Sequence, residues 1–272
     1  MDKRSILPIK SDVIFRLFFA DERNVEFLTG FLKSALDLPE DDYGDMEISD
    51  PHLLPEHPGD KLGIIDIKLR TRSKKVVHIE IQLSVTPELK NRIVFYDAKL
   101  VTEQIGKGDD YAAIKRVISI VVTDEKLIDT SLRYHHRFTL YDKDAGVQFT
   151  DLLEVHTLEL SKLPRDADGT PLYDWASFIA AETEEELDLL AERNPTISKA
   201  VVKLKELSAD ERARDLYERR EKERRDIAMF VRAGIKQSQF EVAKNMLAAG
   251  ETVEKITMYT GLTREEVEGL TP

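Results

Sequence analysis

The most constraining feature of the sequence is the stretch from Gly63 to Leu83, GIIDIKLRTRSKKVVHIEIQL. Apolar and polar residues alternate with period two on both sides of a basic segment, which is typical of two β-strands joined by a turn. We therefore predict a β-hairpin that reverses between Arg70 and Lys75. One face carries Ile65, Ile67, Leu69, Val77, Ile79, Ile81 and Leu83, and the other carries Asp66, Lys68, His78, Glu80 and Gln82.

The length of the turn decides whether the polar residues of the two strands meet. A three-residue loop at 72–74 pairs Thr71 with Lys75 and sets Asp66 directly opposite Glu80. Directly opposed residues have Cβ atoms roughly 4.5–5.5 Å apart, and two carboxylates that close repel each other unless a cation lies between them. A hard divalent cation with oxygen ligands meets this requirement. A two-residue loop would instead put the two carboxylates on opposite faces.

An Asp on one strand followed by Glu-x-Gln on the next resembles the core of the PD-(D/E)XK nuclease superfamily. More closely, the chain resembles the Rpn family of recombination-promoting nucleases, also described as transposases. The stretches that carry the resemblance are KSDVIFRLFF (10–19), Asp66, EIQ (80–82), RIVFYDAKLVTEQIGKGDDY (92–111) and AKNMLAAGETVEKITMYTGLTREEVEGL (243–270). The resemblance implies an α/β fold with a restriction-endonuclease-like mixed β-sheet flanked by helices. It also implies a metal-dependent DNA endonuclease linked to recombination or transposition.

The resemblance implies a role for each polar residue of the hairpin, with Asp66, Glu80 and Gln82 as the catalytic set. Asp66 and Glu80, with the carbonyl of Ile81, would hold one or two Mg²⁺ ions, in whose place Mn²⁺ or Ca²⁺ can stand. The metal polarises the scissile phosphate and lowers the pKa of a bound water, which attacks in line. Gln82 stands where lysine is commonest in the superfamily, so it orients the water or a phosphate oxygen instead of acting as a cation or base. Lys68 either supplies the missing positive charge or is an exposed strand lysine.

Three further residues have two interpretations each. Asp12 is either a cap or first-turn acid of a helix, or it reaches the metal site as a helix-borne acid does in many PD-(D/E)XK enzymes. Arg92 and Tyr96 lie four residues apart on one side of a helix predicted over 88–106. They either belong to a core helix with a snorkelling arginine, or flank a DNA-binding cleft in which Arg92 contacts a phosphate through a bidentate hydrogen bond.

The composition limits the class of protein. With 272 residues, 42% of them hydrophobic, the chain is long enough for one core plus an appendage, and no apolar run is long enough to span a bilayer. The chain has no cysteine, which excludes disulfides and zinc–thiolate sites, and it opens without the apolar core of a signal peptide, so we expect a cytoplasmic protein. The net charge of −12 argues against tight nonspecific binding to DNA, which requires a basic footprint.

The remaining periodicity predicts a nuclease-like α/β domain over 1–207 and a charged helical tail over 208–272. Helices are expected over 11–36 (two helices), 88–106, 172–192 and 196–207, and strands over 46–49, 116–123, 134–141 and 152–160. Two capping boxes are expected to open helices of the tail. They are Ser208 with Glu211, before a charged helix through Arg225, and Thr263 with Glu266.

The last part of the tail reads as helices separated by Gly250 and Gly261, which resembles a helix-turn-helix layout. Its candidate recognition helix, 253–259, offers only Lys255 as a cation, so we prefer docking or formation of a homodimer to direct base reading. An alternative function is therefore a catalytically inactive DNA- or protein-binding scaffold that oligomerises through the tail. A nuclease acting on RNA would share the same site.

Overall fold

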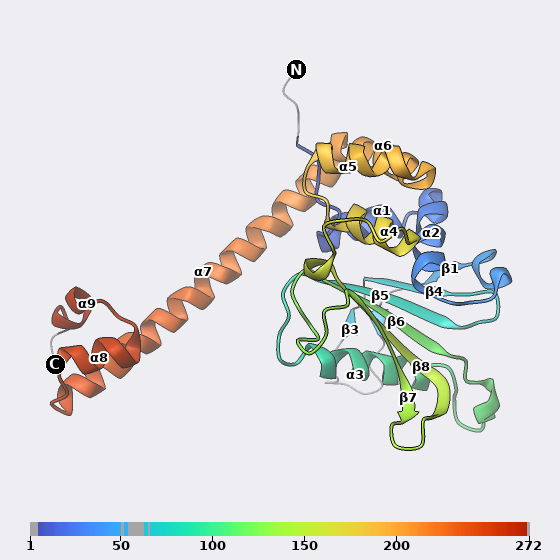
Figure 1. Cartoon of the computed structure of the whole chain (residues 1–272). Helices are drawn as coiled ribbons and strands as arrows, with labels where there is room; N and C mark the ends of the chain where they lie inside the picture. The colour runs from blue at the N-terminus through green and yellow to red at the C-terminus, as the bar shows by residue number, and fades with distance from the viewer. Residues whose placement is uncertain (1–4, 50–51, 54–62, 65, 271–272) are drawn as a thin grey trace. The chain divides into compact units, whose positions relative to one another are not determined.

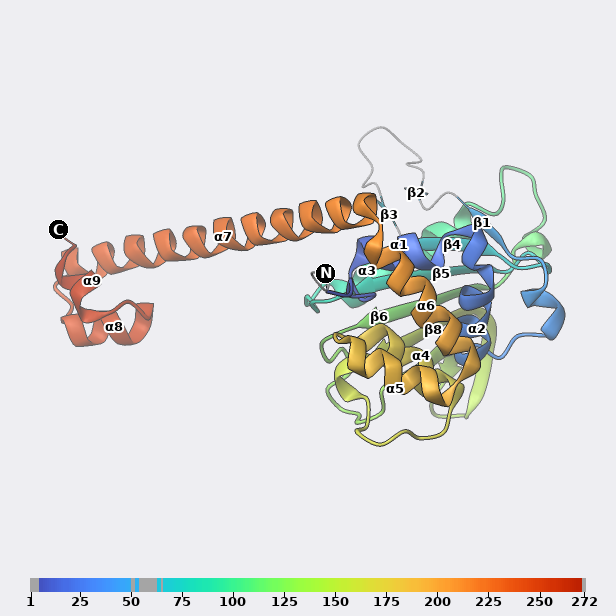
Figure 2. The ribbon, with the colours of Figure 1, turned by 90° about the horizontal axis from the view of Figure 1, so that it is seen from above.

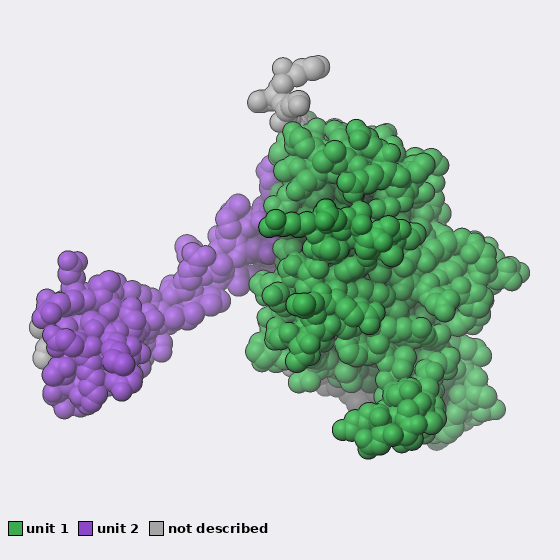
Figure 3. Space-filling view, viewed as in Figure 1, with its two compact units in different colours: residues 1–217 green, residues 218–272 purple. Residues whose placement is uncertain are grey.

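The structure is a computed structural model that describes residues 5–49, 52–53, 63–64 and 66–270. The chain forms two compact units, Met1–Tyr217 and Glu218–Pro272, which Figure 3 shows in different colours. The division falls inside a long helix, whereas the sequence placed it between residues 207 and 208. The first turn of that helix belongs to the larger unit because Ala213 is buried in the main core.

A mixed six-stranded sheet in the order β1-β4-β5-β6-β8-β7 is the centre of the larger unit. Its strands are β1 (Glu47–Ser49), β4 (Ile67–Arg70), β5 (Val76–Gln82), β6 (Val117–Thr123), β7 (His135–Asp142) and β8 (Val147–Glu159). β5, β6 and β8 run parallel, whereas β1 with β4, β4 with β5 and β7 with β8 are antiparallel. A separate pair joins β2 (His52–Leu53) to β3 (Gly63–Ile64).

Helices cover both faces of this sheet (Figures 1 and 2). In the larger unit these are α1 (Asp12–Phe19), α2 (Val25–Ala35), α3 (Leu89–Thr102), α4 (Pro171–Ala180), α5 (Glu184–Arg193) and α6 (Pro195–Ala209), with the short 3-10 helices η1 (Glu22–Asn24), η2 (Glu40–Tyr43), η3 (Tyr111–Ala113) and η4 (Leu160–Lys162). α3 is the crossover between β5 and β6 and lies on one face, while α1, α2 and α4 cover the other, with α5 and α6 outside them. The predicted α/β class is confirmed.

The main core lies between the sheet and the α1, α2 and α4 layer. Phe15, Phe18 and Phe19 recur at helical spacing on α1, so all three project to the same side and are fully buried. The ring of Trp175 on α4 lies 6.0 Å from that of Phe19 and 6.4 Å from that of Phe31, measured between centroids. The Phe31–Trp175 pair is edge to face and the Phe19–Trp175 pair is tilted, and large rings packed in this way contribute strongly to core stability.

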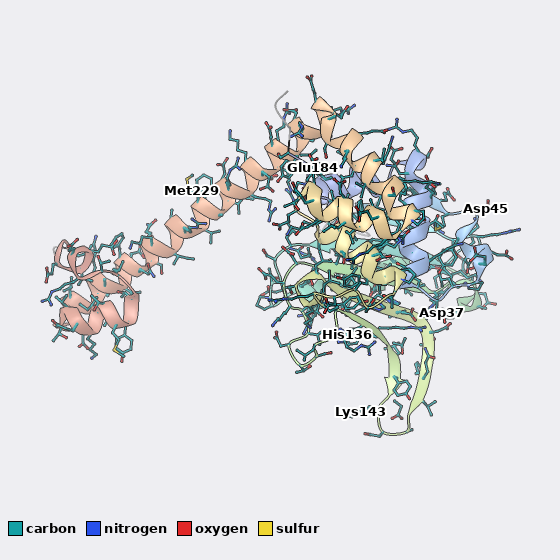
Figure 4. All side chains as sticks on the ribbon, turned by 45° about the horizontal axis from the view of Figure 1, so that its top comes forward. Asp37, Asp45, His136, Lys143, Glu184 and Met229 are labelled. Carbon is teal, nitrogen blue, oxygen red and sulfur yellow. The ribbon has the colours of Figure 1, made fainter. Side chains whose placement is uncertain are left out.

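One strand is longer than its sequence pattern indicated. The strand predicted over 152–160 is β8, which begins earlier, at Val147, because Gly146 adopts a left-handed φ of 70° and closes a tight turn from β7. Figure 4 shows this hairpin extending beyond the rest of the sheet, with Lys143 at its tip. The first half of β8 is largely exposed on both faces, so it does not have the buried apolar face by which a strand is predicted.

Two predicted helices have other ends in the structure. The helix predicted over 172–192 divides into α4 and α5, because Thr183 and Glu186 form a capping box that starts a new helix. The helix predicted over 88–106 is α3, which ends at Thr102, four residues before the predicted end. The two helices predicted over 11–36 and the strand over 46–49 are confirmed as α1, α2 and β1.

The tail contains one long helix, α7 (Glu211–Ala248), of 38 residues. The predicted charged helix therefore does not end near Arg225, since it continues without a break. The predicted cap at Ser208 is wrong: Ser208 lies within α6, and Asp210 instead accepts a hydrogen bond from the backbone N–H of Ala213 at 2.8 Å. In the described part of the chain, no helix combines the length and apolar character needed to cross a membrane, and a cytoplasmic setting stays a prediction.

In the smaller unit, α8 (Val253–Thr260) and α9 (Arg264–Glu268) pack on the end of α7. Their shared core is formed by Ala243, Ile256, Leu262 and Val267. The turns before and after α8 contain Gly250 and Gly261, which have φ values of 80° and 72°, as expected for residues that follow helix ends. The predicted capping box of Thr263 with Glu266 is confirmed at the start of α9.

The contact between α2 and α4 predicts that Gly30→Ala destabilises the larger unit. A Cβ at Gly30 would lie 2.8 Å from Cζ2 of Trp175, so overpacking should lower the free energy of unfolding by about 1–3 kcal/mol. Gly234→Ala is the control, because no described atom lies within 4 Å of its Cβ position. Urea unfolding followed by the fluorescence of Trp175, the only tryptophan, measures both; equal stability of G30A and the unmodified protein would contradict the prediction.

Candidate active site

The turn between β4 and β5 has the predicted three-residue loop, 72–74. The backbone N–H of Thr71 donates to the carbonyl of Lys75 at 3.0 Å and closes the loop. Lys74 adopts a left-handed φ of 65°, the conformation that ends a common form of three-residue hairpin loop. The two-residue alternative is therefore excluded.

The register that follows from this turn brings the two acidic residues together. Ile67 pairs with Ile79 at the last position of the ladder, and Asp66 directly precedes it. Oδ2 of Asp66 accepts a hydrogen bond from the backbone N–H of Ile81 at 2.8 Å. The carboxylate of Asp66 therefore lies beside the strand that carries Glu80, near enough for its negative charge to raise the pKa of Glu80.

A buried acidic side chain from η2 fixes the turn. Oδ1 of Asp42 accepts a hydrogen bond from the backbone N–H of Ser73 at 2.9 Å, and Oδ2 accepts one from Nζ of Lys75 at 2.6 Å. Burial alone would raise the pKa of Asp42, but these bonds to Lys75 and Ser73 lower it to about 2. Nothing in the sequence distinguishes Asp42 from the neighbouring exposed Asp41, so sequence reasoning missed it.

Glu80 is the most strongly perturbed residue of the hairpin. It is 8% exposed, and its Oε1 accepts a hydrogen bond from Nη2 of Arg92 at 3.1 Å. Its Oε2 is buried and has no hydrogen-bond partner among the described residues. Burial raises the pKa of Glu80 to about 8, and the negative charge of Asp66 adds to the rise while Arg92 opposes it. The positive charge of Arg92 is therefore too small to offset the cost of burying Glu80 in its charged form.

α3 brings two predicted residues to the same place. Nη2 of Arg92 also donates to Oε1 of Gln82 at 2.6 Å, and Nε2 of Gln82 donates to the carbonyl of Ser84 at 3.0 Å. Tyr96 lies one turn later, and its pKa is raised by burial and by the nearby charge of Glu80. Arg92 does not merely snorkel, because it joins Glu80 to Gln82.

α1 contributes an arginine that sequence reasoning missed. Nε of Arg16 lies 4.0 Å from Oδ1 of Asp66. Because Arg16 belongs to the KSDVIFRLFF motif, that motif could have pointed to it. Asp12 is the first residue of α1, and its Oδ1 accepts a hydrogen bond from the backbone N–H of Val13 at 3.0 Å. The interpretation of Asp12 as a first-turn acid is confirmed, and its approach to a metal stays a prediction.

Lys68 is not the exposed strand lysine of one interpretation, and its supply of positive charge to the site stays a prediction. It is 8% exposed, since α3 and the segment after it cover this face, so the expectation of an exposed lysine is wrong. Its Nζ donates to Oε2 of Glu103 at 2.8 Å. The structure therefore directs Lys68 to Glu103 and brings Asp66, Glu80, Gln82 and Arg92 together.

Deeper on the same face, a Ser-His-Asp set joins the sheet to α3. Nε2 of His78 lies 2.8 Å from Oδ1 of Asp97, and the hydroxyl of Ser119 donates to the same carboxylate. All three residues are buried, His78 and Ser119 completely. A nucleophile without access to substrate cannot act, so this set stabilises the packing of α3 on β5 and β6.

The donors present fit a hard divalent cation. Among the described residues no three His, Asp or Glu side chains cluster in the way needed to hold a metal alone. The carboxylates of Asp66 and Glu80 can be joined by the carbonyl of Ile81, which points to the same edge as its N–H, the group that donates to Asp66. Mg²⁺ is typically bound by one or two carboxylates, with water and phosphate oxygens completing its shell. Oε2 of Glu80, which has no hydrogen-bond partner among the residues that the structure describes, is of the atom type that such a cation binds.

The mixed sheet, with an acid before one hairpin strand and Glu-x-Gln on the next, defines a protein of the restriction-endonuclease-like PD-(D/E)XK class. The family model described as PD-(D/E)XK nuclease family transposase matches residues 9–234, and the chain belongs to that family. Membership confirms the fold inferred from the resemblance and indicates a nuclease-like, transposase-associated role. Searches of curated proteins and of solved structures returned no match.

Removal of the charge that fixes the turn should weaken the fold in a pH-dependent way. Because the pKa of Asp42 falls from 3.8 to about 2 on folding, its contribution is complete above the unfolded value and is lost as the pH falls through the folded one. Asp42→Asn should therefore lower the free energy of unfolding by about 2 kcal/mol at pH 7, and the deficit should shrink towards pH 2. Urea unfolding at several pH values tests this, with exposed Asp41→Asn as control; a deficit independent of pH would contradict it.

Proposed function

We propose that this protein is a Mg²⁺-dependent endonuclease that hydrolyses phosphodiester bonds of DNA during recombination or transposition. The proposal is supported by the buried carboxyl group of Glu80, which lies near Asp66 and has one oxygen without a hydrogen-bond partner in the described part of the chain. Such a carboxylate is costly to keep charged without a cation. The fold family supplies the reaction class, a hydrolysis of phosphodiester bonds.

Each residue of the site has a separate task in this proposal. A divalent metal would supply electrophilic assistance to the phosphate and a water of lowered pKa. Asp66 and Glu80 hold the cation together with the carbonyl of Ile81, and Mn²⁺ or Ca²⁺ can replace Mg²⁺ there. Gln82, whose amide is fixed by Arg92 and Ser84, orients the water or a phosphate oxygen.

Positive charge for a DNA substrate is present beside the site. Arg16 and Arg92 flank the two carboxylates, and Tyr96 extends the same side of α3. Asp12 lies one turn before Arg16 and is the remaining candidate for an additional ligand. With a net charge of −12, the protein should hold DNA through the metal and these few residues instead of through a broad basic surface.

Loss of either carboxylate should abolish cleavage without loss of the fold. Asp66→Asn and Glu80→Gln should each reduce Mg²⁺-dependent nicking of supercoiled plasmid by more than about 100-fold, since even outer-shell changes at metal sites cost 10–100-fold. Asp144→Asn, at an exposed turn, is the control, and circular dichroism checks folding. RNA and DNA oligonucleotides of equal sequence would show which nucleic acid is cut; nicking that survives both substitutions would refute the proposal.

An apolar stripe on α7 supports a second proposal, that the tail forms a homodimer. Ile227, Val231, Ile235 and Val242 are about half exposed and lie within an arc of about 80° when each residue turns the helix by about 100°. Ala243, which packs against α8 and α9, projects from another side of α7. The spacing is close to that of a coiled-coil seam, for which a second copy of the same helix is the simplest partner. A protein that forms this dimer but does not nick DNA would fit the alternative function, a catalytically inactive scaffold that oligomerises through its tail.

A charge placed in the stripe should separate the two copies. Ile235→Lys should shift the molar mass measured by light scattering after size-exclusion chromatography from dimer to monomer, because lysine cannot be buried in an apolar seam without a large desolvation cost. Met258→Lys is the matched control, since Met258 is 80% exposed on α8, outside the stripe. A monomeric unmodified protein, or a dimer that survives Ile235→Lys, would count against assembly through α7.

A further inference from the structure

Arg92 already binds the carboxyl group that a cation would use, through the oxygen Oε1 of Glu80. A single atom, Nη2, donates both to Oε1 of Glu80 and to Oε1 of Gln82, at 3.1 and 2.6 Å. These two oxygens are the groups assigned above to holding a metal and to orienting its water or phosphate. A guanidinium in this position is the nearest positive charge to Glu80.

The arginine is held there incompletely. Its Nε is buried without a hydrogen-bond partner among the described residues, although a guanidinium has five donors available. The side chain is 36% exposed, whereas that of Glu80 is 10% exposed, so Arg92 extends from the buried carboxylate towards solvent. Oε2 of Glu80 also remains without a partner. Both members of the ion pair therefore have bonding capacity that the pair itself does not use.

We propose that Arg92 is an exchangeable partner of Glu80: it holds the carboxyl group of Glu80 and fixes Gln82 in the metal-free protein, and it is displaced towards the substrate phosphate when a divalent cation binds. The inference rests on the proposed metal-dependent function. A cation held by Oε2 of Glu80 repels the guanidinium on Oε1 of the same carboxyl group, so binding of one weakens the hold of the other. Arg92 is a positioning residue before the metal binds and a phosphate ligand afterwards.

The exchange has a cost that can be measured as metal affinity. If only the fraction of molecules with Arg92 displaced can bind metal, the apparent dissociation constant rises in inverse proportion to that fraction. A hydrogen bond to a charged group is strong enough to keep the open fraction at about one tenth or below. Removal of the guanidinium should therefore tighten metal binding, which is the opposite of the effect expected for an arginine that only supports the fold.

The test is calorimetric titration of Ca²⁺ into the full chain without DNA. Arg92→Gln should bind Ca²⁺ about tenfold more tightly than the unmodified protein. Lys90→Gln removes the same unit of charge from the exposed side of the same helix, so it controls for long-range electrostatics and should change affinity less than about twofold. Arg92→Lys, which keeps the charge but loses the planar fork, should fall between the two.

A second measurement uses a labelled DNA duplex in saturating Ca²⁺. Because the displaced arginine would contact phosphate, Arg92→Gln should bind this duplex several-fold more weakly by fluorescence anisotropy, despite its tighter metal binding. Opposite shifts in the two affinities support the exchange. Unchanged or weaker Ca²⁺ binding by Arg92→Gln, in a protein whose Ca²⁺ binding is lost in Asp66→Asn, would overturn the exchange and leave the proposed function standing. No Ca²⁺ binding by any variant, with no nicking, would remove the proposed function itself.

Discussion

The three-residue turn between β4 and β5 is the constraint on which the candidate site depends. Side chains alternate between the faces of a strand, so a slip of one residue would move Asp66 to the opposite face from Glu80. Lys74 accepts a left-handed conformation that non-glycine residues seldom adopt, and the buried Asp42 holds the loop from outside through Ser73 and Lys75. A structural ion pair at one end of the hairpin thus fixes the position of the acidic residues at the other end.

Periodicity was sufficient to predict this hairpin because its pattern, turn length and register are all local. The strand β6 and the helices α1 and α2 were predicted for the same reason, since each has an apolar pattern of its own. The approach of Arg16 to Asp66 joins residues fifty positions apart, so periodicity does not signal it, and only the resemblance carried by residues 10–19 points to this helix. The same holds for Lys68, whose partner Glu103 belongs to the segment after α3.

The polar face of the hairpin is largely buried, and this burial changes the chemistry of the residues on it. α3 covers this face, so His78 becomes part of a closed network and Lys68 an internal ion pair. Glu80 lies at the edge of the covered region, with its carboxylate nearly buried and its arginine partner partly exposed. Because burial at that edge disfavours the charged form of Glu80, its carboxylate is stabilised when a cation binds to it.

The absence of the usual lysine beside Glu80 then has a physical explanation. Gln82 carries no charge, but its side-chain carbonyl oxygen accepts a hydrogen bond from Arg92, so a guanidinium lies beside this position of the strand. A strand lysine is a fixed part of the hairpin, whereas Arg92 comes from α3 and can leave the carboxylate without disturbing the sheet. We infer that Arg92 on α3 supplies the positive charge that a lysine on the strand would supply. In a chain with a net charge of −12, a movable Arg92 can bind Glu80 in the metal-free protein and a phosphate in the DNA complex.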